Sequence, residues 1–285
     1  MQRIFALGVD EDQIPGIWEL RHPSPTLWVQ SPHNVLDLFL THSSRLIYCT
    51  GTKVEILAVE GKDPNEAPYG WDEVLHVPCP FFIKRTSGVV IGDSLVLLGG
   101  EKNPQEACQL DFRTETWTTL SPMREKRITA ASVALDPHTL LVLGGSDLDK
   151  TFSCCESLDV RTGQWSPSFE TLPVPLSGHA VTVYDDHVYN SGGWDGNKSR
   201  GEVWRSKVNG LGPWEALSSL NIERHNHGMM GDSVGGLSVV GGRQQTSFGS
   251  TEIVATETLS LDGGQGWATN VKLPFKKVWQ ATDMK

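Results

Sequence analysis

Arginine and histidine side chains recur in segments that are predicted to be loops, where their chemistry suits recognition of an acidic group. A guanidinium group is planar and donates paired hydrogen bonds to a carboxylate or a phosphate. Aromatic side chains in the same segments can anchor a bound protein. The formal net charge is −10, so a local concentration of positive charge is informative. The residues selected as candidates for binding a partner are Arg85, Arg124, Arg127, His179, Trp194, Arg224, His227 and Arg243.

The alternative interpretation is that these side chains are loop charges in water. Carboxylates occur in the same segments and could pair with some of the arginines. They include Glu125, Asp147, Asp149 and Glu223.

One pair of histidines has a spacing that could bind a metal ion. In a strand, both rings of His225-Asn226-His227 would lie on one side, as a metal site needs. No third ligand follows from spacing, so we expect these histidines to bond neighbouring backbone groups, and we expect no metal and no cofactor. The sequence contains no G-x-x-x-x-G-K-[S/T] or H-E-x-x-H motif, and no catalytic residue is predicted. The aspartates that precede turns, and that we expect to accept hydrogen bonds from turn backbone, are Asp111, Asp159 and Asp262.

A repeat positions these segments. An apolar stretch ending in a glycine pair occurs four times, and the second glycines stand at 100, 145, 193 and 242, so the steps are 45, 48 and 49 residues. A tryptophan follows each pair, 17 to 25 residues after its second glycine. Two earlier units keep a single glycine, Gly8 and Gly51, each with a tryptophan, Trp28 or Trp71, 20 residues later. A period near fifty residues indicates a repeat architecture, here of six units. The marker residues of the four complete units are Gly99, Gly100, Trp117, Gly144, Gly145, Trp165, Gly192, Gly193, Trp214, Gly241, Gly242 and Trp267.

Each unit is predicted to contain four short antiparallel strands. In the third unit, alternation and turn residues place them at 86–91, 94–98, 108–112 and 117–120. Units of this kind build the blades of a β-propeller, and we expect almost no helix. The glycine pair permits unusual φ values or a close approach to a neighbouring chain. The tryptophan ring is large enough to pack between adjacent blades.

The third and fourth units carry the residues that point to a family. They read Leu110-Asp111-Phe112-Arg113-Thr114-Glu115-Thr116-Trp117 and Leu158-Asp159-Val160-Arg161-Thr162-Gly163-Gln164-Trp165. In this combination of a glycine pair, a short strand with aspartate, a turn and a tryptophan, the sequence resembles kelch repeats. The resemblance implies an all-β, six-bladed kelch β-propeller with four-stranded antiparallel blades, formed by residues 1–285 as a single domain. Its blades are marked by Gly8, Gly51, Gly100, Gly145, Gly193 and Gly242.

The two ends of the chain are expected to meet. The chain begins with a second strand at residues 3–8, whereas residues 277–282 lie where a first strand is due. We therefore expect the C-terminal strand to pair with the N-terminal blade as its innermost strand, because this removes an exposed sheet edge.

The loops can be sorted onto two ends of the ring. In a four-stranded meander, the loop between strands two and three lies at the same end as the connection to the next blade. We call this end the loop face. It comprises 101–106, 121–127, 146–153, 172–177, 194–202, 218–227 and 243–250.

Composition excludes several classes. The net charge of −10 disfavours general nucleic-acid binding and attraction to an anionic membrane. Five cysteines without framework spacing indicate reduced thiols and a protein of the cytoplasm or nucleus. The N-terminal apolar piece is too short and too acidic for a signal peptide, and no apolar run is long enough to span a membrane. We expect a monomer.

The resemblance also bears on function. In kelch substrate receptors, the corresponding face commonly binds acidic peptides through arginines near the mouth of the central channel. It implies a non-catalytic propeller that presents its loop face to a protein or peptide, expected to be acidic, as a scaffold or substrate adaptor. Many kelch proteins carry a BTB or F-box domain that links them to ubiquitin ligases. Because the repeats begin within the first ten residues, we expect either a scaffold that acts alone or a fragment or reduced paralogue of such an adaptor. The alternative is an enzyme similar to sialic acid mutarotases, acting on a small carboxylated sugar, with Arg85 or Arg127 and His179 as candidates.

Overall fold

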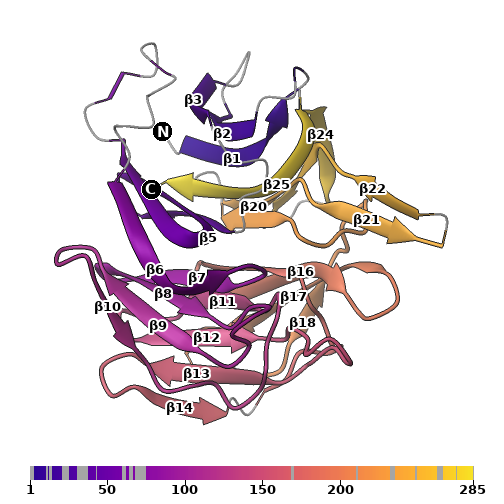
Figure 1. The fold of residues 1–285 in the computed structure, drawn as a ribbon. Helices are drawn as coiled ribbons and strands as arrows, with labels where there is room; N and C mark the ends of the chain where they lie inside the picture. Colours follow the sequence, from indigo (N-terminus) through magenta and orange to yellow (C-terminus); the bar gives the residue numbers. More distant parts are fainter. Residues whose placement is uncertain are drawn as a thin grey trace.

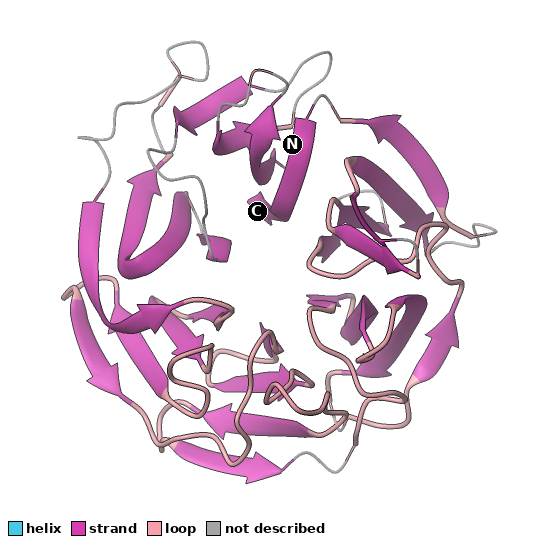
Figure 2. Cartoon of the chain, turned by 45° about the vertical axis from the view of Figure 1, so that its right-hand side comes forward, coloured by secondary structure: helices cyan, strands magenta, loops and turns pink. Residues whose placement is uncertain are grey.

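The computed structural model of the protein describes residues 3–10, 12, 15–20, 26–30, 38–42, 44–59, 62–63, 67, 75–167, 170–209, 211–231, 235–247, 249–261, 266–273 and 275–284. Within these residues the regular elements are all β-strands, β1 to β25. Figure 2 shows the strands grouped into sheets that follow one another around a ring, with both chain ends near its inner side. The described chain contains no helix with the length and apolar character needed to cross a membrane.

Three consecutive sheets have the predicted arrangement of four antiparallel strands. Their strand orders are β7-β8-β9-β10, β11-β12-β13-β14 and β15-β16-β17-β18, so neighbours in sequence are neighbours in space (Figure 1). The strands predicted for the third unit agree with β7 to β10 to within one residue at each end. The bounds are β7 Ser87–Ile91, β8 Ser94–Leu98, β9 Ala107–Asp111, β10 Thr116–Thr119, β11 Ala131–Ala134, β12 Thr139–Leu143, β13 Cys155–Asp159, β14 Gln164–Pro167, β15 Ala180–Tyr184, β16 His187–Trp194, β17 Ser199–Lys207 and β18 Glu215–Leu217.

The next sheet carries an extra hairpin. Its order is β19-β20-β23-β24, and β21 pairs with β22 as a separate two-stranded sheet within the loop between β20 and β23. Residues 243–250 are predicted to be a plain loop, whereas the structure forms this hairpin there. The bounds are β19 Gly228–Gly231, β20 Gly236–Val240, β21 Arg243–Thr246, β22 Gly249–Glu252, β23 Ala255–Ser260 and β24 Ala268–Lys272.

The first two units form less regular sheets. The second unit is a three-stranded sheet, β4-β5-β6, in the described chain, although four strands are predicted. β5 is a single long strand that pairs first with β4 and then, beyond a register shift at Gly51, with β6. Gly51 has φ +52°, which only glycine adopts readily, and Trp71 lies outside the described residues. The bounds are β4 Leu38–His42, β5 Arg45–Ala58 and β6 Leu75–Ile83.

The two ends of the chain lie side by side. The sheet order is β25-β1-β2-β3, and β25 pairs with β1 in antiparallel orientation, with Phe5 opposite Thr282 and Leu7 opposite Gln280. Figure 1 shows β25 running along β1 at the edge of this sheet. The C-terminal strand is thus the neighbour of the first strand of the chain, where the sequence predicts it. The bounds are β1 Arg3–Asp10, β2 Pro15–Glu19, β3 Thr26–Gln30 and β25 Phe275–Met284.

The glycine pairs have the backbone role that the sequence predicts. All eight glycines have positive φ, between +55° at Gly192 and +113° at Gly100. A Cβ atom at Gly99 would lie 2.3 Å from the Arg127 carbonyl oxygen, and one at Gly144 would lie 2.3 Å from the Leu176 carbonyl oxygen. The first glycine of each of these pairs therefore lies directly against the backbone that leads into the next sheet, where no side chain fits.

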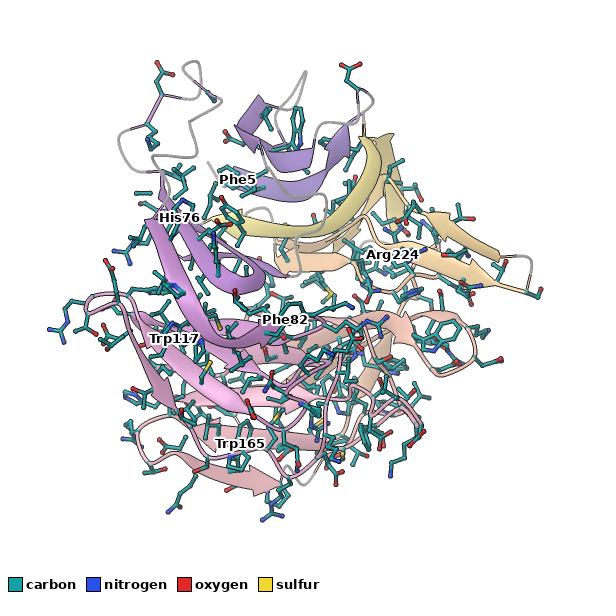
Figure 3. All side chains as sticks on the ribbon, in the orientation of Figure 1. Phe5, His76, Phe82, Trp117, Trp165 and Arg224 are labelled. Carbon is teal, nitrogen blue, oxygen red and sulfur yellow. The ribbon has the colours of Figure 1, made fainter. Side chains whose placement is uncertain are left out.

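The tryptophans join neighbouring sheets, as predicted. The indole N–H of Trp117 donates to the Pro78 carbonyl at 2.7 Å, and that of Trp165 donates to the Ser121 carbonyl at 2.7 Å. Trp267 makes the corresponding bond to Ser218 at 2.8 Å. Figure 3 shows Trp117 and Trp165 beside the outer strands of adjacent sheets. Each ring thus fastens its own sheet to the chain segment of the preceding one.

The core lies between successive sheets. Leu95 and Leu97 of β8 pack in one apolar cluster, whereas Val96 and Leu98 pack in another, because alternate residues of a strand point to opposite faces. The blade that contains β8 is therefore apolar on both faces, which leaves its ends to carry functional side chains.

Candidate functional site

Arg127 is predicted to lie on the loop face, but its side chain lies inside the wall of the propeller. Its side chain is 1% exposed and forms an ion pair with the Glu156 carboxylate at 2.9 Å. The same guanidinium donates to the backbone carbonyls of Gly144 and Cys154. Glu156 also accepts the backbone N–H of Arg124 at 3.0 Å. A guanidinium with these partners cannot contact a bound protein, so its predicted partner-binding role is wrong.

Arg224 repeats this arrangement two sheets later and is corrected in the same way. It is fully buried, pairs with Glu257, and donates to the backbone carbonyls of Gly241 and Ala255. Glu257 accepts the backbone N–H of Asn221 at 2.6 Å. Figure 3 labels Arg224 within the body of the molecule. Both arginines hold the connection between two blades against the third strand of the next blade.

His179 and His227 are also buried, at 6% exposure each, so their predicted partner-binding roles are wrong as well. Ideal Cβ atoms at Gly144 and Gly192 would each lie 2.8 Å from a ring carbon, of His179 and His227 respectively, so the rings fill space beside the glycine pairs. His227 Nε2 lies 2.9 Å from the Ser191 hydroxyl. Burial lowers the pKa of His179 to about 3, and the charge of Arg127 acts in the same direction. His179 is therefore neutral at physiological pH.

Four residues, each just before the first strand of a sheet, are linked to one another by backbone hydrogen bonds. Arg85, Thr129, Gly178 and Asn226 all have left-handed φ, between +51° and +57°. The amide of each later residue donates to the carbonyl of its predecessor, at 2.8 Å for Thr129 to Arg85, 2.8 Å for Gly178 to Thr129 and 2.7 Å for Asn226 to Gly178. Because Asn226 is left-handed, the residues around it are not a strand.

The two histidines that flank Asn226 accordingly contact different partners. His225 Nδ1 lies 2.9 Å from the Ser199 hydroxyl, whereas His227 contacts Ser191. Their expected backbone partners are thus replaced by serine hydroxyls. Among the residues described there is no grouping of three or more His, Cys, Asp or Glu side chains suited to a metal ion.

The predicted role of the turn aspartates is confirmed where the structure describes them. Asp111 Oδ1 accepts the backbone N–H of Arg113 at 2.8 Å and of Thr114 at 2.9 Å. Asp159 accepts the corresponding N–H of Arg161 at 2.9 Å, and its pKa is lowered to about 2, chiefly by the Arg161 side chain. Asp262 lies outside the described residues.

An exposed cluster of cations, which we call the basic patch, remains on the loop face. It consists of Arg85, Lys102, Arg124 and Lys126, all exposed and without an ion pair to any described residue. The loop that carries Lys102 packs on the 121–127 connection through backbone bonds from Met123 to Gln105 and from Arg127 to Pro104. Lys102 was not among the predicted residues, because in the sequence it stands between Glu101 and Glu106 without any visible distinction.

Other cations of this face already have partners within the chain. Lys84 pairs with Glu101 at 2.8 Å, and Arg243 pairs with Glu252 at 3.2 Å. Arg200 pairs with both Asp195 and Glu202. The alternative interpretation, loop charges neutralised locally, therefore fits Arg243, whereas the four residues of the basic patch form no ion pair with a described residue.

A cleft of about 440 Å³ lies between the loops of two neighbouring sheets. Trp194 lines it, and its ring stands 5.7 Å from the His225 ring at 59°. Burial lowers the pKa of His225 to about 4, so this neighbour is an uncharged ring at neutral pH. Trp194 is thus the predicted aromatic residue that the structure does place at an open site. The cleft is lined by Ser146, Leu148, Asp149, Lys150, Thr151, Pro175, Ser177, Trp194, Asp195 and Gly196.

These observations define the class: a β-propeller whose blades carry a glycine pair and an interlocking tryptophan. The KLHDC2/KLHL20/DRC7 Kelch-repeats domain matches residues 86–262. The chain belongs to the kelch-repeat family.

Relatives agree with this assignment. The chain is 26% identical to Kelch-like protein 36 of Bos taurus over 48% of its own length and 24% of that protein. It is 31% identical to Kelch repeat and BTB domain-containing protein 1 of Cowpox virus (strain GRI-90 / Grishak), over 39% of this chain and 20% of that one. The chain thus spans about a quarter or less of the length of these two relatives.

Two further likenesses cover more of the chain. N-(sulfonatooxy)prop-2-enimidothioate sulfolyase of Thlaspi arvense is 25% identical over 68% of this chain and 59% of that protein. The solved structure entitled "Structure of YjhT" superposes with a TM-score of 0.71 at 14% identity, covering 85% of this chain and 84% of that one. At that identity the likeness shows the fold.

Proposed function

We propose that this propeller is a non-catalytic binding module that holds a partner protein or peptide on its loop face. The observation that carries the proposal is the basic patch, whose four exposed cations form no ion pair with a described residue. Glu101, which acts electrostatically on Arg85 and Lys102, is itself paired with Lys84. Net charge is −10 overall, so the chain holds this local excess against its general composition. Guanidinium and ammonium groups left open in this way suit an acidic segment of a partner.

The family supports a role in protein interaction. The kelch-like relative from Bos taurus and the viral relative, whose name includes a BTB domain, are longer proteins of which this chain matches a part. We propose that the present chain acts as the partner-recognition element of such an arrangement, as scaffold or adaptor. The buried Arg127 provides the rigidity, because it fixes the connection from which Arg124 and Lys126 project.

Affinity capture with charge-reversed protein tests the proposal. Arg85→Glu, Arg124→Glu and Lys126→Glu are combined in one variant. The matched control is Arg113→Glu with Lys207→Glu, two exposed cations at the opposite end of the sheets. Tagged proteins are incubated with cell extract, and bound proteins are quantified by mass spectrometry. We expect specific partners to be lost from the patch variant and kept by the control; equal recovery by all three proteins would refute the proposal.

An enzymatic role is the second candidate, and one observation favours it: the likeness to the sulfolyase extends over 68% of the chain. The residues considered for a mutarotase-like reaction do not converge, because Arg85 is exposed whereas Arg127 and His179 are inside the wall. Mutarotation of N-acetylneuraminic acid can be followed by proton NMR. A rate above buffer that is abolished by Arg85→Gln would favour the enzyme over the binding module.

A further inference from the structure

Two consecutive blades present the same turn on the loop face. In residues 146–151 the Asp147 amide donates to the Lys150 carbonyl at 3.2 Å, and the Asp147 carboxylate accepts the Lys150 amide at 3.0 Å. In residues 194–199 the Asp195 amide donates to the Lys198 carbonyl at 3.3 Å, and the Asp195 carboxylate accepts the Lys198 amide at 2.8 Å. The turns are therefore equivalent position by position.

The third residue of each turn is left-handed, and here the two copies differ. Gly196 has φ +98°, which costs glycine nothing. Its counterpart is Leu148, with φ +83°, a conformation that a branched apolar side chain adopts only against steric strain. The sister turn shows that glycine fits here, so the fold does not require leucine.

Burial does not compensate for that strain, because Leu148 is 73% exposed. The other large apolar side chains that are exposed in the described chain, Leu75 and Phe82, are each 40% exposed and have no such backbone conformation. Leu148 therefore combines two unfavourable features, strain and apolar exposure, at one position. Strained residues held against folding preference cluster at ligand-binding sites.

Leu148 lines the same 440 Å³ cleft as Trp194. The Trp194 ring is held by the His225 ring at 5.7 Å, and His225 is in turn held by the Ser199 hydroxyl at 2.9 Å. A cleft with a fixed aromatic ring and an exposed leucine suits an apolar side chain from outside. The Ser146–Ile128 bridge joins this cleft to the segment that follows the basic patch.

The charged residues that line the cleft indicate which charge a bound partner segment would carry beside its apolar side chain. Asp149 is exposed and has no ion pair with any residue in the described ranges. Asp195 is already paired with Arg200 at 3.1 Å. The Lys150 ammonium lies 5.2 Å from the centroid of the Phe152 ring, in the same chain. Among the carboxylates that line the cleft, Asp149 is therefore the one without an ion pair to a described residue, and Lys150 is the cation beside it.

We propose that the cleft between the 146–151 and 194–199 turns is a docking site for a partner segment with an apolar side chain next to a lysine or arginine. The apolar side chain contacts Leu148 and Trp194, and the cation pairs with Asp149. This inference rests on the proposed binding function and extends it to a second, oppositely charged contact.

Selection from a phage-displayed library of random nine-residue peptides tests the site. Peptides enriched on the wild-type protein are synthesised, and their Kd values are measured for Leu148→Gly, Leu148→Ala and Asp149→Asn. Leu148→Gly removes the apolar group and the strain together, whereas Leu148→Ala retains the left-handed strain. The control is Leu75→Ala, an exposed leucine on β6.

We expect enriched peptides to carry an apolar residue beside Lys or Arg. Both Leu148 variants should bind them roughly tenfold to a hundredfold more weakly, the loss expected for one buried leucine. Asp149→Asn should cost about two- to fivefold, as for a surface ion pair, and Leu75→Ala should change nothing. The melting temperature of Leu148→Gly should be unchanged or roughly 2–4 °C higher, because strain is relieved.

Other outcomes overturn the inference, and they separate it from the proposed function. Peptides that bind Leu148→Gly normally but fail on the Arg85, Arg124 and Lys126 charge-reversed variant would refute the docking site and retain the proposed function. A library that yields no peptide dependent on either surface would refute both. A melting temperature of Leu148→Gly several degrees below wild type would show that leucine serves the fold, and this too would overturn the inference.

Discussion

Arg127 and Leu176 occupy equivalent positions in successive blade connections. The carbonyl oxygen of Arg127 lies 2.3 Å from the Cβ position of Gly99, and that of Leu176 lies 2.3 Å from the Cβ position of Gly144. Arg127 reaches Glu156, whereas Leu176 packs in one apolar cluster with Trp204. Equivalent positions in the propeller wall are thus occupied by an ion pair in one blade and by an apolar pair in the next.

This exchange predicts the outcome of a double substitution. Arg127→Leu alone should lower the free energy of unfolding by about 3–5 kcal/mol, because it leaves the Glu156 carboxylate buried without its partner. Adding Glu156→Leu should recover at least half of that loss, because the sister connection is stable with apolar residues. Urea unfolding of the wild type, both single variants and the double variant provides the cycle; equal losses in the single and the double variant would show that the ion pair is not the coupled unit.

The contrast also explains why sequence reasoning placed Arg127 and Arg224 wrongly. An arginine in a polar connection between blades looks like a surface residue, and the spacing of the repeat does not reveal burial. A signal was present in the third strands: Glu156 and Glu257 stand where the equivalent strands have Cys108 and Trp204. A carboxylate among apolar strand positions needs a buried partner.

Repeating features, in contrast, were predictable. The glycine pairs and tryptophans do the same work in each blade, so their spacing carries the fold and their roles follow from backbone conformation and ring size. Leu148 and Lys102 are side chains that the equivalent positions of other blades do not share, so the repeat spacing does not point to them. The left-handed conformation of Leu148 was visible only by aligning it with Gly196 in the next blade.

The first glycines should be more sensitive to substitution than an equally left-handed glycine in open space. Gly144→Ala would place a methyl group 2.3 Å from the Leu176 carbonyl, whereas Gly92, with the same φ of +56°, has no atom within 4 Å of that position. We expect Gly92→Ala to cost about 1 kcal/mol from strain alone. Gly144→Ala should cost about 2 kcal/mol more from overpacking. Chemical denaturation measures both, and equal costs would contradict the role assigned to the pair.

The tryptophan bonds between sheets can be isolated by comparing two rings. Trp165 donates to the Ser121 carbonyl at 2.7 Å, whereas the indole N–H of Trp214 has no acceptor in the described chain. Replacing either with phenylalanine removes similar ring area. We expect Trp165→Phe to destabilise by about 1 kcal/mol more than Trp214→Phe, the net contribution of one hydrogen bond. Thermal melts of both variants are the check; an identical shift would assign the effect to packing.

Buried His179 should make stability depend on pH. Its folded pKa is about 3, below the ordinary value of 6.5, so between these values the unfolded chain binds a proton that the folded chain does not. The stability from neutral His179 is therefore complete above about pH 6.5 and falls as the pH decreases toward 3. His179→Ala, with alanine as at the equivalent Ala130, should reduce the slope by about 1.4 kcal/mol per pH unit over this window. Urea unfolding at pH 6.5, 5.5 and 4.5 compares the slopes, and an unchanged slope would show that His179 is protonated in the folded protein.

Binding by the basic patch is the central claim, and affinity at two salt concentrations tests it most directly. A partner recovered by affinity capture is titrated calorimetrically with wild type, with the Arg85, Arg124 and Lys126 charge-reversed variant, and with the Arg113 and Lys207 control. The account predicts at least tenfold weaker binding for the patch variant, and a wild-type Kd that rises between 50 and 200 mM salt, because exposed charge pairs are screened. A patch variant that binds as tightly as wild type, with the same salt dependence, would contradict it.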